Sequence, residues 1–133
     1  NSYGPGDTIG SVHISVPDSM TMAEVHPLTK GIAVHLYKKF DINMTVGVYA
    51  ENKPSVEVLE IRKALDQVIS LYTHVVQVHA FYVQEEKKVI YYDIIFDFDE
   101  EDPHSTLEKI KTEMQKRYPD YTQFAIVDTD FSN

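Results

Sequence analysis

One pattern of secondary structure occurs twice in this chain, and this repetition limits the possible folds more than any other feature. Residues 11–52 begin with alternating apolar and polar side chains, continue with an amphipathic stretch and end with a second alternating run. Residues 91–130 repeat this order, and aligning the first strands places His13 on Asp93. Repeats of this kind are copies of one supersecondary unit, so a functional site is sought at equivalent positions in both.

The first copy is predicted to consist of a strand, a helix and a strand. Thr21 and Glu24 have the spacing of a capping box, which satisfies free amides at the start of a helix. Pro27 lies within the helical pattern, so the helix either kinks at this proline or begins there. The three elements are expected at residues 9–16, 21–40 and 42–50.

The second copy is predicted to contain two further elements, a helix and a strand that precede the repeated pattern. Its second strand places an apolar row from Ile90 to Phe98 on one face and Tyr91, Asp93 and Asp97 on the other. The resulting order α-β-β-α-β is ferredoxin-like, with the helices on one face of the sheet. The five elements are expected at residues 54–72, 75–84, 89–98, 102–118 and 121–130.

Composition excludes several classes of function. The formal net charge of -9 argues against binding to a nucleic-acid backbone, which requires a basic patch. The absence of cysteine excludes disulfides, thiolate nucleophiles and cysteine-rich zinc sites. No apolar run is long enough to span a bilayer, and no secretory signal is visible. The chain begins at Asn1 rather than methionine, which suggests a fragment of a longer protein.

One histidine and several carboxylates fall on strands that are expected to be neighbours. His79 lies on the first strand of the second copy, Asp93 on the second, and Asp128 and Asp130 on the last. Closely spaced carboxylates repel and raise one another's pKa, and a divalent cation relieves this repulsion. An imidazole combined with carboxylate oxygens suits Mn²⁺, Fe²⁺, Zn²⁺ or Co²⁺. The alternative is that the aspartates are ordinary surface residues and that His79 is simply half-buried.

Other candidate sites are less specific. The acidic run 97–102 is followed by a proline where a calcium loop needs glycine, so we expect a solvated loop there. His26, His35 and His104 are expected on the exposed flanks of helices. No serine or threonine lies in a nucleophile motif, so an enzyme is not predicted. Tyr91 and its apolar neighbours are candidates for an interface, because the sheet face without helices must be covered.

Three motifs together resemble a known family. They are Tyr3-Gly4-Pro5-Gly6, Ser11-Val12-His13-Ile14 and Glu24-Val25-His26-Pro27-Leu28-Thr29-Lys30. With this combination the chain resembles the cytoplasmic C-terminal domain of cation diffusion facilitator transporters, over nearly its whole length and in tandem. The resemblance implies a metallochaperone-like domain that forms pairs and belongs to a membrane antiporter exchanging divalent metal for protons. It also implies that metal bound at the pair steadies the arrangement that favours transport.

The resemblance implies a set of metal ligands in the second copy. The family's first-strand histidine matches His79, and its second-strand histidine matches Asp93. The closing His-x-Asp pair of the family falls on Asp128 and Asp130, so aspartate replaces histidine twice. These replacements shift the set toward oxygen ligands and away from a zinc-specific site.

In the first copy the same family positions are mostly lost. His13 matches the second-strand histidine and is a candidate ligand of second rank. Alignment by the helices places Val48 on Ile126, and it then places the closing pair on Ala50 and Asn52, which cannot supply an anionic ligand. The first copy is therefore expected to retain only the pairing role.

We therefore expect an α+β protein of two ferredoxin-like, metallochaperone-like β-β-α-β halves, residues 1–52 and 53–133, the first truncated at its start. The halves are expected to pack as an internal pseudo-dimer. The predicted function is the cytoplasmic metal-sensing and dimerisation domain of a divalent-cation efflux transporter. The predicted partners are divalent cations, the transmembrane domain of the same protein and a second copy of the full-length transporter at the cell membrane. The alternatives are a protein-interaction module without metal and a regulatory domain holding a small molecule between the halves.

Overall fold

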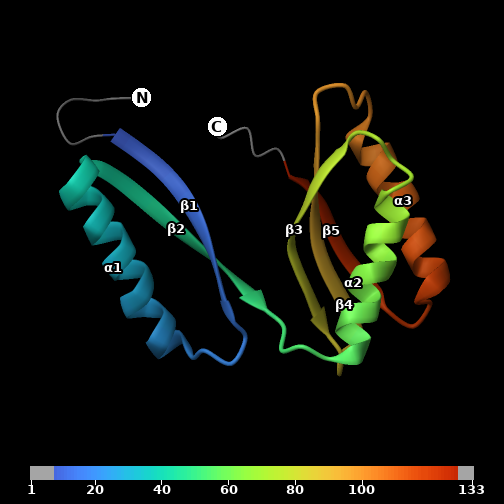
Figure 1. Ribbon diagram of the computed structural model, residues 1–133, viewed down its shortest axis with the longest axis horizontal. Helices are drawn as coiled ribbons and strands as arrows, with labels where there is room; N and C mark the ends of the chain where they lie inside the picture. The colour runs from blue at the N-terminus through green and yellow to red at the C-terminus, as the bar shows by residue number, and fades with distance from the viewer. Residues whose placement is uncertain (1–7, 129–133) are drawn as a thin grey trace. The chain divides into compact units, whose positions relative to one another are not determined.

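The computed structural model describes residues 8–128, so the motif Tyr3–Gly6 and Asp130 lie outside the described residues. The chain folds into two compact units, Asn1–Lys53 and Pro54–Asn133. Each unit has its own β-sheet, and the described residues contain three helices in all (Figure 1). Within these residues no helix combines the length and the apolar character needed to cross a membrane. The described chain is a mixed α+β protein, compatible with the predicted ferredoxin-like arrangement.

The first unit consists of strand β1 (Thr8–Pro17), helix α1 (Met22–Phe40) and strand β2 (Ile42–Glu51). The two strands are parallel neighbours, and α1 is the crossover that joins them. The Thr21 hydroxyl accepts a hydrogen bond from the Glu24 amide at 3.2 Å, and the Glu24 carboxylate accepts one from the Thr21 amide at 2.8 Å. The capping box is thereby confirmed. The helix begins at Met22 and continues through Pro27, so the predicted alternative of a start at the proline is wrong.

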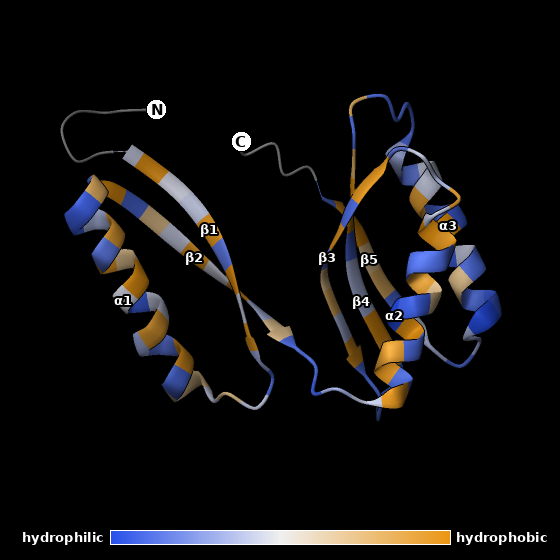
Figure 2. Cartoon of the chain, viewed as in Figure 1, coloured by the Kyte–Doolittle hydropathy of each residue, from blue (hydrophilic) through white to orange (hydrophobic). Residues whose placement is uncertain are grey.

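The first unit has a small core. In its described part the buried hydrophobic residues are Val16 and Val25. Leu28 and Phe40, which belong to the apolar stripe of α1, remain 41% and 56% exposed. Figure 2 shows apolar positions recurring along α1 between hydrophilic ones. Two strands and one helix offer too little surface to bury this stripe, so the unit presents apolar side chains on its surface.

The second unit consists of helix α2 (Val56–Ile69), strands β3 (Val75–Gln84) and β4 (Val89–Phe96), helix α3 (Pro103–Arg117) and strand β5 (Thr122–Asp128). The strand order is β3-β4-β5, with β3 antiparallel and β5 parallel to β4. Both helices lie on the same face of this sheet (Figure 1). The predicted order α-β-β-α-β is therefore confirmed for this unit.

The core of the second unit lies between its sheet and its two helices. The most deeply enclosed side chains are Tyr92, Ile61, Leu65, Ile90, Ile94, Ile110, Met114 and Val68. Tyr92 is the polar member of this group, and its hydroxyl donates a hydrogen bond to Oε1 of Gln123 at 2.5 Å. Nε2 of Gln123 in turn donates to the carbonyl oxygen of Lys111 at 2.8 Å. This chain of bonds joins β4, β5 and α3, and burial raises the pKa of the Tyr92 hydroxyl.

Strand β4 ends earlier than its alternating pattern predicts. The apolar row is buried as far as Phe96, but Phe98 is 87% exposed. The chain turns after Phe96 because the Asp97 side chain accepts a hydrogen bond from the Asp99 amide at 2.9 Å. Placing Phe98 in the helix-facing row was wrong, since the alternation of residue types continues into a turn where it has no structural meaning.

Candidate metal centre

The sheet of the second unit has one face that carries no helix, which we call the open face. Because side chains alternate along a strand, Tyr91, Asp93 and Ile95 of β4 point to this face while their neighbours fill the core. On β5, Phe124 and Ile126 are 58% and 59% exposed. The open face is therefore the part of the unit where polar ligands and exposed apolar side chains lie together.

The predicted ligands His79, Asp93 and Asp128 come from three adjacent strands of this face. His79 on β3 is the register partner of Asp93 on β4. Nδ1 of His79 lies 3.6 Å from Oδ2 of Asp128 on β5, and their side chains are 27% and 26% exposed. Because β4 lies between β3 and β5, this pair spans the strand that carries Asp93. One imidazole and two carboxylates therefore gather in one region, while Asp130 lies outside the described residues.

His13 in the first unit has different surroundings. Its ring stacks on Tyr49, with 5.0 Å between ring centroids and an interplanar angle of 11°. The ring also lies over Gly47, where an added Cβ would come within 2.4 Å of it, so a larger residue at that position would displace the ring. In the described part of the chain, no close group of three metal-ligand side chains includes His13. The geometry is that of a packed aromatic pair.

The strand register changes one predicted equivalence between the copies. In the first unit His13 is paired with Gly47, and in the second unit Asp93 is paired with Ile126. Gly47 is therefore the equivalent of Ile126, whereas alignment by the helices places Val48 there. The equivalent of Asp128 is consequently Tyr49 and not Ala50. Alignment by the helices slips by one residue because the helices and their flanking loops differ in length. A slip of one residue moves a side chain to the other face of a sheet.

A tighter group of metal-ligand side chains lies at one end of the same sheet. His74, Asp97 and Asp99 each offer one ligand atom, and these atoms all lie within 4.8 Å of one another. Among the described residues, only this group of three has its ligand atoms so close together. The ligand atoms of the His79 set are farther apart. His74 was missed because it lies in the turn before β3, where no periodic pattern points to a face. For Asp97 and Asp99 the sequence predicts only a solvated loop.

The contact between His74 and Asp97 shifts the pKa of both groups. The hydrogen bond to Asp97 raises the pKa of His74 above its usual value, although partial loss of hydration opposes this effect. Loss of hydration would raise the pKa of Asp97, but the hydrogen bonds from His74 and from the Asp99 amide together hold it below its usual value. Without metal, the pair thus favours a protonated imidazole beside an ionised carboxylate.

Aromatic side chains occupy the part of the open face next to His79 and Asp93, two residues away along β4. The ring of Tyr91 stacks on Phe124 with a centroid distance of 5.6 Å, and it lies 6.4 Å from the ring of Tyr82 in a tilted arrangement. The Tyr91 hydroxyl donates a hydrogen bond to Oε1 of Gln84 at 3.1 Å. We call Tyr82, Tyr91 and Phe124 the aromatic row. It crosses all three strands and is a flat, partly exposed surface of the kind found at interfaces.

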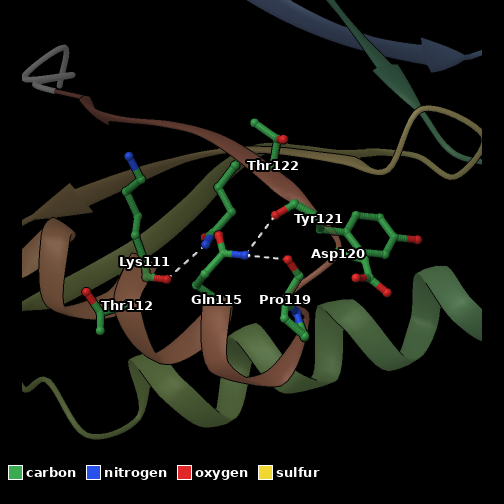
Figure 3. Close-up of a pocket in the computed structure, with 8 residues that line it drawn as sticks. Lys111, Thr112, Gln115, Pro119, Asp120, Tyr121 and Thr122 are labelled. Atoms are coloured by element: carbon green, nitrogen blue, oxygen red, sulfur yellow. Dashed lines mark hydrogen bonds between the residues drawn. The ribbon is translucent and has the colours of Figure 1, made fainter.

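A polar hollow between the end of α3 and the start of β5 is less suited to a ligand (Figure 3). Nε2 of Gln115 donates to the carbonyl oxygens of Pro119 and Tyr121 at 3.0 and 3.1 Å. Nε2 of Gln123 donates to the carbonyl oxygen of Lys111 at 2.8 Å. These amide groups tie the loop to the helix instead of presenting donors to a ligand.

The remaining histidines are exposed, as expected for residues on the solvent-facing sides of helices. They are His26, His35 and His104. Comparison of the chain with protein-family models, with curated proteins and with solved structures finds no match. The function of the chain therefore has to be inferred from the chemistry of the open face itself.

Proposed function

We propose that the chain is the cytoplasmic metal-sensing and pairing domain of a divalent-cation efflux transporter of the cation diffusion facilitator type. The supporting observation is the approach of Nδ1 of His79 to Oδ2 of Asp128 at 3.6 Å, across the strand that carries Asp93. An imidazole and two carboxylates are a suitable donor set for Mn²⁺, Fe²⁺, Co²⁺ or Zn²⁺. Asp130, two positions after Asp128 in the sequence, is the fourth proposed ligand.

The charge of the two carboxylates is the physical reason why His79, Asp93 and Asp128 would bind a cation. Asp93 and Asp128 bring two negative charges to one face of a sheet, and His79 offsets at most one of them. A divalent cation neutralises both carboxylates and is bound by the folded unit in preference to the unfolded chain, where the ligands are not assembled. Binding therefore stabilises the folded unit and any arrangement that brings these ligands together.

In this proposal the first unit serves as the pairing partner of the second unit. That unit exposes apolar side chains on α1, and the second unit exposes the aromatic row. We infer that the two units pack as an internal pseudo-dimer in which these surfaces are covered. A cation bound next to the aromatic row would fix the relative pose of the two units, and the transmembrane domain would respond to that pose.

Calorimetric titration of the metal-free chain with Mn²⁺, Zn²⁺, Co²⁺ and, without oxygen, Fe²⁺ tests the metal site. We expect saturable binding at micromolar metal that His79→Ala and Asp128→Ala each weaken by about tenfold or more, because each removes one ligand. His26→Ala is the matched control, since His26 is an exposed histidine of the first unit and should leave binding unchanged. Binding that neither ligand variant alters would contradict the proposal.

A second candidate function is a protein-interaction module that needs no metal, and the aromatic row favours it. Tyr91 and Phe124 form a stacked pair on a face without helices, and Phe124 is 58% exposed. Such a surface suits a flat apolar partner. Association that is unchanged by chelator and by His79→Ala, but lost in Phe124→Glu, would favour this function over metal sensing.

A further inference from the structure

We infer that the second unit holds another divalent cation at His74, Asp97 and Asp99, where three ligand atoms lie within 4.8 Å of one another. This site shares no residue with the proposed His79 site and does not rest on it. Asp97 follows Asp93 by four residues, and Asp128 of the His79 set is paired with Ile95, two residues before Asp97. The two sites would therefore be neighbours along the same sheet, each with its own ligands.

The backbone already holds the three residues together. The Asp97 amide donates a hydrogen bond to the His74 carbonyl oxygen at 2.9 Å, which joins the turn before β3 to the segment after β4. The Asp99 amide donates to Oδ1 of Asp97 at 2.9 Å. Nδ1 of His74 lies 3.0 Å from Oδ1 and 3.2 Å from Oδ2 of Asp97. Metal–ligand bonds of about 2.0–2.2 Å require ligand atoms within about 4.4 Å of one another, so the three side chains would have to close slightly around the ion.

The charges around the cluster also favour a cation. Residues 97–102 contain five carboxylates, and no ion pair in the described part of the chain joins them to a lysine or arginine. Glu100 and Asp102 each accept a backbone amide through a side-chain oxygen. The Asp99 carboxylate accepts no hydrogen bond from the residues that the structure describes. It is therefore available to a cation, which would also relieve the repulsion within the loop.

The donor types indicate which cation this site takes. Ca²⁺ and Mg²⁺ prefer ligand sets made of oxygen alone, whereas one of these three ligand atoms is an imidazole nitrogen. An imidazole nitrogen with two carboxylate oxygens suits first-row transition ions and Zn²⁺, with water in the remaining positions. A cation bound here would cross-link the start of β3 to the loop between β4 and α3.

The test uses the full chain, labelled with ¹⁵N, freed of metal and titrated with Zn²⁺. Long-range ¹H–¹⁵N NMR reads the imidazole nitrogens of His74 and His79 separately. We expect a saturable shift at His74 that weakens by about tenfold or more in Asp99→Asn, which removes a ligand but keeps the amide that bonds Asp97. Glu86→Gln removes a charge from the exposed turn between β3 and β4 and should leave the His74 titration unchanged.

A variant of the other site separates the two proposals. In His79→Ala the titration of His74 should persist. A titration confined to His74 supports this second site and contradicts the proposed function. The absence of a saturable shift at His74 in millimolar Zn²⁺, or a titration that Asp99→Asn leaves unchanged, overturns the second site whatever is observed at His79.

Discussion

Nδ1 of His79 and Oδ2 of Asp128 lie 3.6 Å apart, although strand β4 separates the two strands that carry them. The contact requires both side chains to lean across the open face above the strand of Asp93. A partly exposed ion pair of this kind contributes at most about 1 kcal/mol to stability. Its interest is therefore chemical, because it places an imidazole nitrogen and carboxylate oxygens close together before any cation arrives.

Cation binding at the His79 set should raise the melting temperature of the second unit. Zn²⁺ at one hundred times its dissociation constant stabilises the folded state by about 2.7 kcal/mol. For a domain of this size that corresponds to a rise of about 10–20 °C in scanning calorimetry. The measurement is made in the Asp99→Asn chain, so that the His74 cluster does not contribute. Adding His79→Ala should remove the rise, whereas a rise of equal size in that variant would contradict the proposed site.

The hydrogen bonds of Tyr92 lead to a prediction about stability. Tyr92→Phe leaves Oε1 of Gln123 without its donor in a partly buried position. We expect the free energy of unfolding to fall by about 1–3 kcal/mol in urea denaturation, because an unsatisfied acceptor keeps its desolvation cost. Tyr91→Phe is the matched control, since its hydroxyl bonds Gln84 on the open face, and it should cost less. Equal losses in the two variants would contradict this account.

Much of the fold of the second unit could be predicted from the periodicity of its apolar residues and from the residues that cap its helices. The apolar row of β4 has the period of two that a strand with one buried face requires, and it lies in the core as far as Phe96. Asp102 before Pro103 indicates the start of α3, and the Asp102 side chain accepts the Ser105 amide at 3.1 Å. The end of β4 could not be predicted, because Phe98 continues the alternation into a turn fixed by local hydrogen bonds.

The sheet face on which a candidate ligand lies could be predicted only where its strand alternates regularly. Alternation along β4 places Asp93 on the open face, but His79 is its register partner only because an irregularity between His79 and Tyr82 shifts β3 by one residue. From the pairing of Gln84 with Val89, a regular hairpin would place His74 opposite Asp99. Two irregularities in β3, one of them near Ala80 with its positive φ of 56°, shift the register along the strand. Such bulges depend on packing of the whole sheet and have no signal in the local sequence.

The capping box at the start of α1 leads to a prediction about pH. Hydrogen bonds from the Thr21 backbone amide and hydroxyl hold the pKa of Glu24 below its usual value. In the unfolded chain a glutamate has a pKa of about 4.3. Because the folded value is the lower one, the stabilising contribution is fully present above the unfolded pKa and is lost as pH falls through the folded pKa.

Carboxyl NMR shifts measured across acid pH test this prediction. Glu24 should titrate below pH 4.3 or so, and Thr21→Ala should raise its midpoint toward that value by removing the hydroxyl donor. The amide remains a donor in the variant, so the rise is partial. A midpoint that stays the same in Thr21→Ala would show that the hydroxyl does not hold the charge.

The small core of the first unit leads to the last prediction. Its described part buries only Val16 and Val25 among its hydrophobic residues, and a two-stranded sheet with so small a core is marginal by itself. If the aromatic row covers this unit in the proposed pseudo-dimer, Phe124→Glu should destabilise it by placing a charge in the shared surface. Amide hydrogen exchange of β1 and β2 should then accelerate by about tenfold or more.

Phe98→Glu provides the matched control for this change. Phe98 is 87% exposed in the turn after β4, so the same substitution adds the same charge without touching the aromatic row. Exchange in β1 and β2 should therefore stay at the level of the unchanged chain. Equal acceleration in both variants would mean that charge alone weakens the first unit. Acceleration in neither would mean that its strands are protected by something other than the aromatic row.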